Sequence, residues 1–333
     1  MDEILAGRAS PAQIAGFVVA LRAKGETAAE VASMADAMLA RAELVPITSA
    51  VMDVVGTGGD HSGSVNISTM AAITVAACGV PVVKHGNRAA SSQAGTADVL
   101  AELGLAIELG PSQVAHCASE LGIGFAFAPV HHPAMRHAAV ARRDLAVPTV
   151  FNILGPLTNP ARAQAALIGC ADAGRAPVMA GVLARRGVHA LVVRGDDGLD
   201  EVSTATTTTV WDATGAEVRL DVIDPGDLGL EPSEASALVG GDPARNARLL
   251  RMAMGLEEVP TTDGSRIHAI RDAVALNAAT ALVAWQSLER TDSSPVSIRI
   301  AEQLPRARQA LVSGRAASLL ERWVVLSQEL SAD

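Results

Sequence analysis

The stretch from Asp53 to Thr69 reads DVVGTGGDHSGSVNIST, which is a short apolar run, a glycine-rich turn and the start of a helical run. The glycines at Gly56, Gly58 and Gly59 remove side chains that would keep a ligand away from the backbone N–H groups. The helix that follows adds its own N-terminal N–H groups and the positive end of its dipole. The turn therefore predicts a phosphate cradle, and an ordinary turn capped by Ser or Asn is the alternative. It is neither GxGxxG nor a Walker A loop, which argues against dinucleotides and nucleoside triphosphates.

A second polar loop follows the next apolar run and reads KHGNRAASSQAGTAD from Lys84 to Asp98. Lys84 and Arg88 supply positive charge, while Ser91 and Ser92 can donate to phosphate oxygens or merely cap a helix. Two consecutive strands thus deliver polar loops to one edge of a sheet. In an open parallel sheet, ligands sit outside the carboxyl ends of the strands. We therefore expect both loops to face the same ligand.

An acidic turn follows a third strand pattern and carries Asp196, Asp197, Asp200 and Glu201. Exposed acidic turns are usually solvated surface. Carboxylates that face a phosphate pocket would repel the ligand, however, unless a divalent cation lay between them. Mg²⁺ held by one or two carboxylates and by substrate phosphates is a frequent arrangement. The turn is therefore a candidate magnesium site.

The fourth segment reads HHPAMRHAAVARRD from residue 131 and is followed by VFNILGPLTNP from residue 150. With Pro133 near its start, the first part predicts a helix with His132, Met135, Ala139 and Arg142 on one face. An arginine on that face could bind a carboxylate with its planar fork. The alternative is an ordinary surface arginine, which is the interpretation that we favour for Arg143. No spacing in this segment is typical of zinc ligands.

The wider pattern predicts a small all-helical N-terminal domain and a larger α/β domain with a mainly parallel central sheet flanked by helices. Residues 1–46 contain only helical signals, at Pro11 to Ala23 and Thr27 to Arg41, and we expect residues 132–160 to contribute to this domain. The α/β domain would span 47–333. Its strands are expected at 52–55, 80–83, 125–128, 165–168 and 189–193, with an antiparallel pair within 206–220 and helices at 243–255, 271–287 and 297–329, the last broken near Gly314.

Composition excludes several classes of protein. The 333 residues are 49% hydrophobic, which is enough for a large core, but only 2% are aromatic and none is Tyr. The net charge of -10 argues against general nucleic-acid binding. Cys78, Cys117 and Cys170 lack CxxC spacing, so neither disulfides nor a zinc site is indicated. We find no signal pattern at the N-terminus and no uncharged apolar run that approaches the length of a membrane span, and we expect a cytoplasmic protein.

Taken in this order, the segments resemble the anthranilate phosphoribosyltransferase family. The motifs GTGGD, NxST, KHGNR, SSxxGxAD, HHPAMRHA, FNxLGPLTNP and the Asp-Glu pair lie at family-like intervals from the helical N-terminus to the final helices. The resemblance implies transfer of the phosphoribosyl group of phosphoribosyl pyrophosphate (PRPP) to anthranilate, in tryptophan synthesis. It also implies two Mg²⁺ ions per subunit and a homodimer formed through the helical domain, with no nucleic-acid or membrane partner.

The resemblance also assigns site residues. Those expected around PRPP are Gly56, Gly58, Gly59, Asp60, Ser64, Asn66, Ile67, Ser68, Thr69, Lys84, His85, Gly86, Asn87, Arg88, Ser91, Ser92 and Thr96. Those expected around anthranilate are Gly56, His85, Asn87, Met135, Arg142 and Gly155. Ser68, Asp200 and Glu201 would bind magnesium, and the residues expected to act in catalysis are Lys84, Arg142, Asp200 and Glu201.

The chain departs from the family pattern at Ala94 and Thr96, where Ser is frequent, and at Ala146, where Gly is common. One alternative function is a pyrimidine nucleoside phosphorylase, which shares the fold and a glycine-rich phosphate loop. The KHGN and FNxLGPLTNP segments speak against it. A second alternative is a catalytically idle relative that binds nucleic acid, which the acidic net charge and the intact Asp200-Glu201 pair disfavour.

Overall fold

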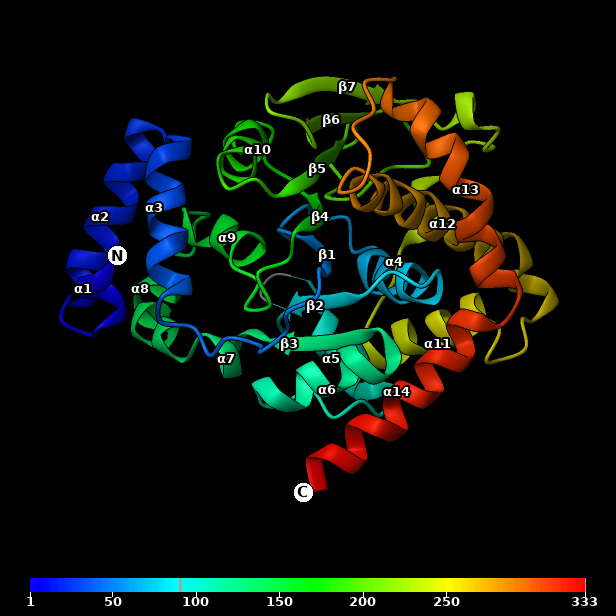
Figure 1. Ribbon diagram of the computed structural model, residues 1–333, viewed down its shortest axis with the longest axis horizontal. Helices are drawn as coiled ribbons and strands as arrows, with labels where there is room; N and C mark the ends of the chain where they lie inside the picture. Colours follow the sequence, from blue (N-terminus) through cyan, green and yellow to red (C-terminus); the bar gives the residue numbers. More distant parts are fainter. Residues whose placement is uncertain (90–91, 333) are drawn as a thin grey trace.

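The computed structural model describes residues 1–89 and 92–332. Its centre is a seven-stranded sheet in the order β3-β2-β1-β4-β5-β6-β7 (Figure 1). The strands are β1 (Met52–Gly56), β2 (Val82–Gly86), β3 (Ile123–Phe127), β4 (Ala165–Gly169), β5 (His189–Gly195), β6 (Thr208–Ala213) and β7 (Arg219–Ile223). The first five are parallel, and β6 and β7 run antiparallel at one edge, as predicted.

The strand order reverses at β1, which lies between β2 and β4. The chain leaves β1 toward β2 and β3 on one side and later returns to β4 and β5 on the other. Loops that follow β1 and β4 therefore diverge at the carboxyl ends of the strands, which is where open α/β sheets bind ligands. This is the edge of the sheet at which the sequence predicts the phosphate loops.

The strands were predicted from apolar runs, and the largest errors are at β7 and β2: β7 extends three residues past the predicted stretch 206–220, and β2 begins and ends later than predicted. The run from Val80 to Val83 predicts a strand two residues too early, because the observed strand continues through Lys84 and His85 to Gly86. Both polar side chains are buried. Burial of polar groups at the end of a strand is unusual unless they are paired, and apolar runs cannot reveal it.

Helices cover both faces of the sheet. One face carries α4 (Ile67–Ala77), α5 (Thr96–Glu102), α6 (Pro111–Leu121), α11 (Pro243–Met254), α12 (Gly264–Gln286), α13 (Val296–Val312) and α14 (Arg315–Ala332). The other face carries α10 (Ala176–Arg185). Alternate residues of β4 divide between the two hydrophobic clusters, since Leu167 packs in the first and Ile168 in the second.

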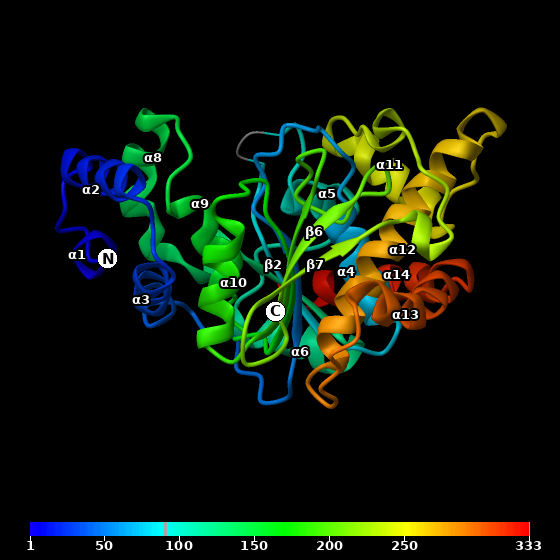
Figure 2. The ribbon, with the colours of Figure 1, turned by 90° about the horizontal axis from the view of Figure 1, so that it is seen from above.

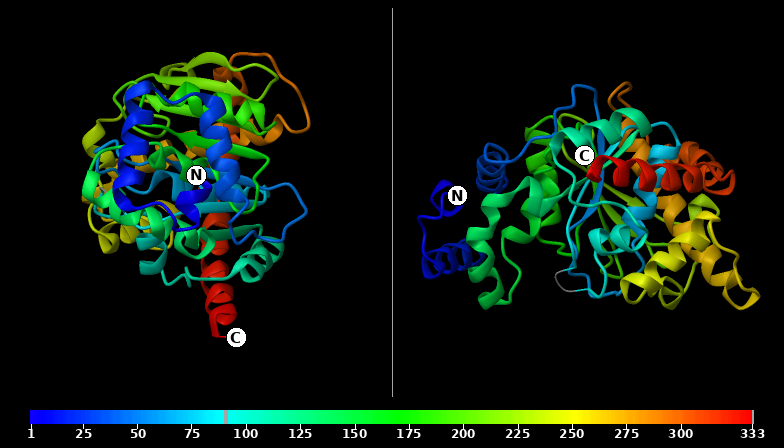
Figure 3. Two further views of the ribbon diagram at one scale, coloured as in Figure 1. Left: turned by 90° about the vertical axis from the view of Figure 1, so that its left-hand side faces the viewer. Right: turned by 90° about the horizontal axis from the view of Figure 1, so that it is seen from below.

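The end of the chain follows the prediction closely. The long helical signal is broken at Gly314, whose φ of 77° lies in the left-handed region. The resulting α14 packs against α4 and α6 and extends past the sheet (Figure 3).

The segment Thr261–Gln286, which contains α12, is long and apolar enough to cross a membrane by length and average composition, although it carries charged residues such as Arg271 and Asp272. However, 83% of its apolar window is buried inside the protein. It packs against α4, α13 and the central strands β4 and β5. Core packing therefore accounts for its composition.

The N-terminal helices are α1 (Asp2–Leu5), α2 (Pro11–Lys24) and α3 (Ala28–Leu39). Capping boxes at Ser10 and Thr27 fix the starts of α2 and α3. These helices share the second hydrophobic cluster with α8 (Ala139–Leu145), α9 (Phe151–Leu154) and α10. Figure 2 shows this helical group beside the sheet. The domain boundary near residue 46 stays a prediction.

The prediction of one helix from Pro133 through Arg142 is wrong. The stretch from Ala128 to Leu157 contains α7 (Ala128–His131), a 3-10 helix at Pro133–Ala138, α8, α9 and a second 3-10 helix at Gly155–Leu157. His132 has φ -124° and ψ 58°, outside any helix, because the residue before a proline is driven from the helical region. His132 therefore does not share a helical face with Arg142.

The residue that ends α8, Ala146, has a φ of 49°, in the left-handed region that favours glycine. We expect Ala146→Gly to raise the free energy of unfolding by about 0.5–1 kcal/mol. The change removes the steric strain of Cβ in the left-handed conformation, and the higher conformational entropy of the unfolded chain offsets part of that gain. Denaturation with urea measures the change. Ala20→Gly, on an exposed position of α2, is the matched control and should lower stability by a similar amount. Equal destabilisation by both changes would contradict the assigned strain.

Candidate active site

The glycine-rich turn after β1 meets the acidic turn after β5. A Cβ at Gly56 would lie 2.3 Å from the Asp200 Oδ2 atom, and one at Gly169 would lie 1.6 Å from the Asp200 carbonyl oxygen. The Gly58 N–H donates a hydrogen bond of 2.7 Å to Asp200 Oδ2. Glycine is therefore required at the ends of β1 and β4 because the acidic turn occupies the space of a side chain.

A second contact joins the start of α4 to the same turn. The Ser68 N–H donates to Glu201 Oε1 at 3.0 Å, and Lys84 Nζ lies 3.3 Å from Ser68 Oγ. Lys84 also donates to the Val54 carbonyl of β1. The structure thus brings Gly56, Gly58, Ser68, Lys84, Asp200 and Glu201 together, from three separate parts of the chain.

Burial sets the electrostatics of this cluster. Asp200, Glu201 and Lys84 are only 9%, 8% and 2% exposed. Burial, and then the charge of Glu201, raises the pKa of Asp200 well above its usual range. Burial raises the pKa of Glu201 to about 7, against the opposing effect of Lys84. Burial also lowers the pKa of Lys84, while the charge of Asp53 opposes that shift. Two adjacent buried carboxyls are stabilised as anions by a cation.

The donor set fits Mg²⁺, which prefers carboxylate and hydroxyl oxygens. The carboxylates of Asp200 and Glu201 and the hydroxyl of Ser68 are the candidates, and the loop beside them provides N–H groups for an anion. The described residues contain no group of three or more His, Cys, Asp or Glu side chains that could hold a metal by themselves. A cation here would therefore need ligand oxygens as well, as is usual for magnesium bound with phosphates.

The rest of the acidic turn has a different role. Asp196 accepts hydrogen bonds from Thr207 and Thr209, and Asp197 accepts one from Ser203. These two carboxylates hold the turn between β5 and β6. Only the last two acids of the predicted cluster face the glycine-rich loop.

The loop from Gly58 to Asn66 is shaped by left-handed residues, with φ of 68° at Gly58, 81° at Gly59 and 58° at His61. Asp60 accepts a hydrogen bond from Ser62, and Ser64 forms a β-bridge with Val239. The buried Ile67 begins α4. The Asn66 side chain does not cap this helix but donates to the Ala94 carbonyl at 3.2 Å and accepts from Asn246 at 2.9 Å.

The second loop is fastened by its own residues. Asp98 accepts hydrogen bonds from the N–H groups of Ala89 and Gly95 and from the Arg88 guanidinium, all at 2.9 Å. A Cβ at Gly95 would lie 2.4 Å from the Ala89 nitrogen. Asn87 accepts from the Arg88 N–H. Arg88 thus forms an ion pair with Asp98 in this structure, and its contact with PRPP stays a prediction.

The other predicted members of this loop are placed as follows. Thr96 lies beside Gly86, and its hydroxyl accepts from Thr69 at 3.2 Å. Ser92 is exposed, and its hydroxyl donates to the nearby Ala94 carbonyl at 3.5 Å. Ser91 lies outside the described residues.

On the other side of β2, two neutral histidines meet. His85 Nδ1 lies 3.0 Å from the Gly155 carbonyl, and its ring centroid is 5.1 Å from that of His132. Burial lowers the pKa of His85 to about 3 and that of His132 to about 4. The His85 Nε2 and His132 Nδ1 atoms are buried with no hydrogen-bond partner within the described residues.

Met135 and Arg142 come from the helical segment between β3 and β4. Met135 is half-buried in the 3-10 helix, and the Arg142 guanidinium lies 5.8 Å from the centre of the Phe151 ring. Arg142 is exposed and has no ion pair among residues 1–89 and 92–332. No direct contact joins either residue to the carboxylate cluster.

Sequence reasoning missed two buried polar residues below the site. Asp53 accepts a hydrogen bond from the His85 N–H at 3.1 Å and another from Asn159 at 2.8 Å. Asn159 also donates to the Val83 carbonyl. Burial raises the pKa of Asp53 to about 6. The available signal was an acid inside an apolar strand pattern, a position that demands a partner.

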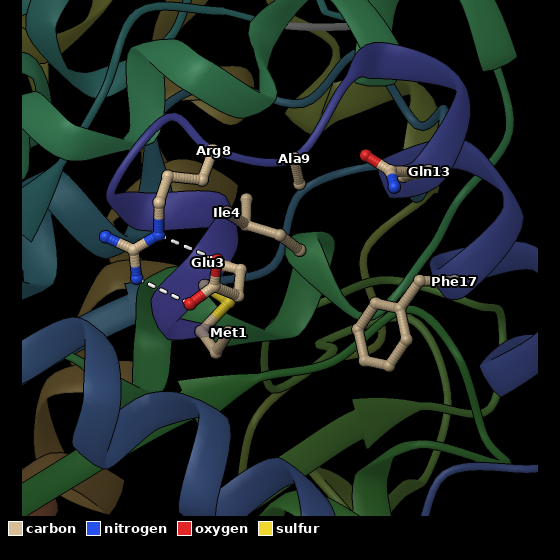
Figure 4. Close-up of a pocket in the computed structure, with 7 residues that line it drawn as sticks. All are labelled: Met1, Glu3, Ile4, Arg8, Ala9, Gln13 and Phe17. Atoms are coloured by element: carbon tan, nitrogen blue, oxygen red, sulfur yellow. Dashed lines mark hydrogen bonds and ion pairs between the residues drawn. The ribbon is translucent and has the colours of Figure 1, made fainter.

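A separate surface hollow of 290 Å³ lies on α1 and α2 (Figure 4). It is lined by Met1, Glu3, Ile4, Arg8, Ala9, Gln13 and Phe17. Its charged members, Glu3 and Arg8, pair with each other at 2.7 Å. Its two charged side chains thus neutralise each other, and none of the residues predicted for the active site lines it.

Known proteins match both parts of the chain. The profile of the glycosyl transferase family, a/b domain, matches residues 48–317, and that of the helical bundle domain of the same family matches residues 1–42. The chain is 54% identical over 330 residues to an anthranilate phosphoribosyltransferase of Saccharopolyspora erythraea, covering 99% of this chain and 90% of the relative. It is also 54% identical to the enzyme of that name from a Nocardioides species, covering 97% and 91%.

Solved structures of anthranilate phosphoribosyltransferases are also similar to this chain. The anthranilate phosphoribosyltransferase of Thermus thermophilus is similar with a TM-score of 0.86 and 42% identity, covering 98% of this chain and 93% of that one. The Saccharomyces cerevisiae enzyme in complex with PRPP and Mg has a TM-score of 0.83 and 29% identity, covering 96% and 86%. With identity above half over nearly the whole chain, this protein belongs to the anthranilate phosphoribosyltransferase family.

Proposed function

We propose that this chain transfers the 5-phosphoribosyl group of PRPP to the amino group of anthranilate and releases pyrophosphate. The observation that carries the proposal is the buried Asp200-Glu201 pair against the glycine-rich loop and Lys84. A carboxylate pair beside an anion cradle suits a ligand that brings its own phosphates and a divalent cation. Family membership gives the substrates, since relatives are named for this reaction.

For PRPP, we propose that the loop from Gly56 to Thr69 and the second loop from Lys84 to Thr96 surround the phosphates and ribose. Backbone N–H groups of Gly59 and the start of α4 would donate to phosphate oxygens. Mg²⁺, held by Ser68, Asp200 and Glu201, would supply charge neutralisation for the pyrophosphate. Lys84 lies within reach of Ser68 and would add a positive charge to the same side.

For anthranilate, we propose the space near His85, Asn87, Met135, Arg142 and Gly155. The buried, neutral histidines give a wall with little charge, which suits an aromatic ring. Arg142 has no ion pair within the described residues and is free to bind the carboxylate of the substrate. A crystal structure of the yeast relative contains 4-fluoroanthranilate, which supports an aromatic subsite in this fold.

The mechanism follows from the chemistry of the two substrates. An aromatic amine is already neutral and nucleophilic at pH 7, so it needs no general base before it attacks. The proton that it loses once the C–N bond has formed passes to water or to the departing pyrophosphate. Positive charge develops on the ribose as pyrophosphate departs. Lys84 and the loop N–H groups stabilise the negative charge of the leaving group, while Arg142 fixes the approach of the amine. The protein therefore acts by positioning and electrostatics.

Four finer points belong to the same proposal: two Mg²⁺ ions per subunit, a homodimer through the helical domain, a helical domain of residues 1–46 with 132–160, and a cytoplasmic location. Phe17 and Val19 are exposed on α2, which supports a partner on that helix. The joint cluster of α1, α2 and α3 with α8 and α9 supports the domain division.

The decisive test follows the fluorescence of anthranilate after PRPP is added with and without Mg²⁺. We expect fluorescence to fall only when both are present. Phosphorolysis of a pyrimidine nucleoside by the same preparation would instead favour the phosphorylase alternative. Salt-sensitive binding to single-stranded nucleic acid, without turnover, would favour the idle relative.

Magnesium affinity should depend on pH through Glu201. Its pKa is raised from 4.5 to about 7, so this group stabilises the ligand-free fold at low pH and that contribution is lost as the pH rises through about 7. The cation needs the anionic form, so its affinity should fall as the pH drops below about 7.

The measurement is the rise in Tm on adding Mg²⁺ with PRPP at pH 6 and pH 8. We expect the larger rise at pH 8. Glu201→Gln is the control, because it lacks this titration and should show a smaller difference between the two pH values. An equal rise for the unchanged chain at both pH values would refute the coupling.

Arg142→Ala should raise the KM for anthranilate by roughly 10- to 100-fold, since a charge-assisted contact is lost. The KM for PRPP should change little. Arg143→Ala is the matched control, because the neighbouring arginine is exposed and pairs with Asp144 at 3.1 Å. Steady-state kinetics with each substrate varied in turn measures both. A change confined to the KM for PRPP would disprove the assigned role.

A further inference from the structure

We propose that Asn277 is a positioning residue that holds the Asp200-Glu201 pair in the geometry needed to bind a divalent cation with PRPP. This inference rests on the proposed function. It concerns a side chain in the middle of α12, on a helix that contributes none of the predicted site residues.

Asn277 forms a two-point contact with the residue next to Glu201. Its Oδ1 atom accepts from the Val202 N–H at 2.9 Å, and its Nδ2 atom donates to the Val202 carbonyl at 2.9 Å. Nδ2 also donates to the Ala273 carbonyl of its own helix. Asn277 is completely buried. The carboxamide therefore pairs with both backbone groups of one residue, as a neighbouring strand would.

The acidic turn needs such a partner because it lies between β5 and β6, outside the sheet ladder. The segment from Asp200 to Ser203 is buried, so its backbone groups cannot be satisfied by bulk water. Ser203 N–H finds the Thr208 hydroxyl at 3.0 Å. For Val202, both backbone partners are supplied by Asn277.

The direction of the two carboxylates depends on this attachment. On one side the turn packs directly against Gly56 and Gly169, where atoms of Asp200 occupy the space that a side chain would take. On the opposite side it is held by Asn277. Without that contact the turn could move away from Ser68 and Gly58, which bind the carboxylates in the present arrangement. Partners that orient metal ligands in this way commonly change metal affinity when they are removed.

Asn277→Ala tests the proposal. We expect Mg²⁺ affinity, measured by calorimetric titration in the presence of PRPP, to weaken roughly 10- to 100-fold. The KM for PRPP at fixed Mg²⁺ should rise and excess Mg²⁺ should partly restore it, while the KM for anthranilate should stay near that of the unchanged chain. All titrations are made well below the Tm of each variant.

Thr280→Val is the matched control. Thr280 is equally buried on the same helix, but its hydroxyl donates only to the Leu276 carbonyl within that helix. It should leave Mg²⁺ affinity unchanged. If Asn277→Ala does not fold, Asn277→Ser is measured in its place. It retains one hydrogen-bonding group, so we expect it to weaken Mg²⁺ affinity by a smaller factor.

A folded Asn277 variant with lower Tm but unchanged Mg²⁺ affinity would overturn the proposal, since Asn277 would then serve stability alone. Equal weakening by Thr280→Val would overturn it as well. Failure of the proposed function looks different: the unchanged chain would bind Mg²⁺ with PRPP but would not consume anthranilate.

Discussion

Two adjacent buried carboxylates, Asp200 and Glu201, constrain the rest of this structure. Their negative charges are costly in the interior unless hydrogen bonds and cations compensate for the loss of water. The surrounding architecture supplies that compensation from separate elements: N–H groups of Gly58 and Ser68, and the ammonium of Lys84 nearby. Glycine at the ends of β1 and β4 follows from the same constraint, because the turn needs their space.

The position of β1 in the sheet explains why these elements can meet. Since β1 lies between β2 and β4, the loop after β1 has a neighbouring loop on each side. The loop after β2 brings Lys84 and His85, and the end of β4 receives the acidic turn. This edge of the sheet therefore has a strongly charged part near β4 and a neutral part, with two histidines, near Gly155. That division matches a substrate pair in which one is a polyphosphate and the other an aromatic ring.

Much of this arrangement could be predicted from the sequence. Alternation of apolar runs and helices gave the parallel sheet, and the Thr- and Val-rich stretch gave the antiparallel edge. The family resemblance singled out Asp200 and Glu201. The local residue pattern could not separate them from Asp196 and Asp197, because the difference lies in partners such as Thr209 and Ser68. The prediction of a single helix from Pro133 also failed. The side chains there have helical spacing, but the structure forms a 3-10 helix at Pro133–Ala138 before the α-helix begins.

Contacts between residues distant in the chain account for the roles that could not be predicted from the sequence. The sequence analysis attributes glycine at position 56 to the approach of a phosphate. The structure adds a second reason that no local pattern reveals, because the atom nearest to a Cβ built there belongs to Asp200. Asn277 lies in a helix whose pattern predicts only core, and nothing local marks its carboxamide as the partner of Val202. A buried amide must satisfy its donors and acceptor, so a polar residue on an apolar face does indicate that some backbone segment depends on it. Which segment that is follows only from the fold, and here it is the one that carries the carboxylate pair.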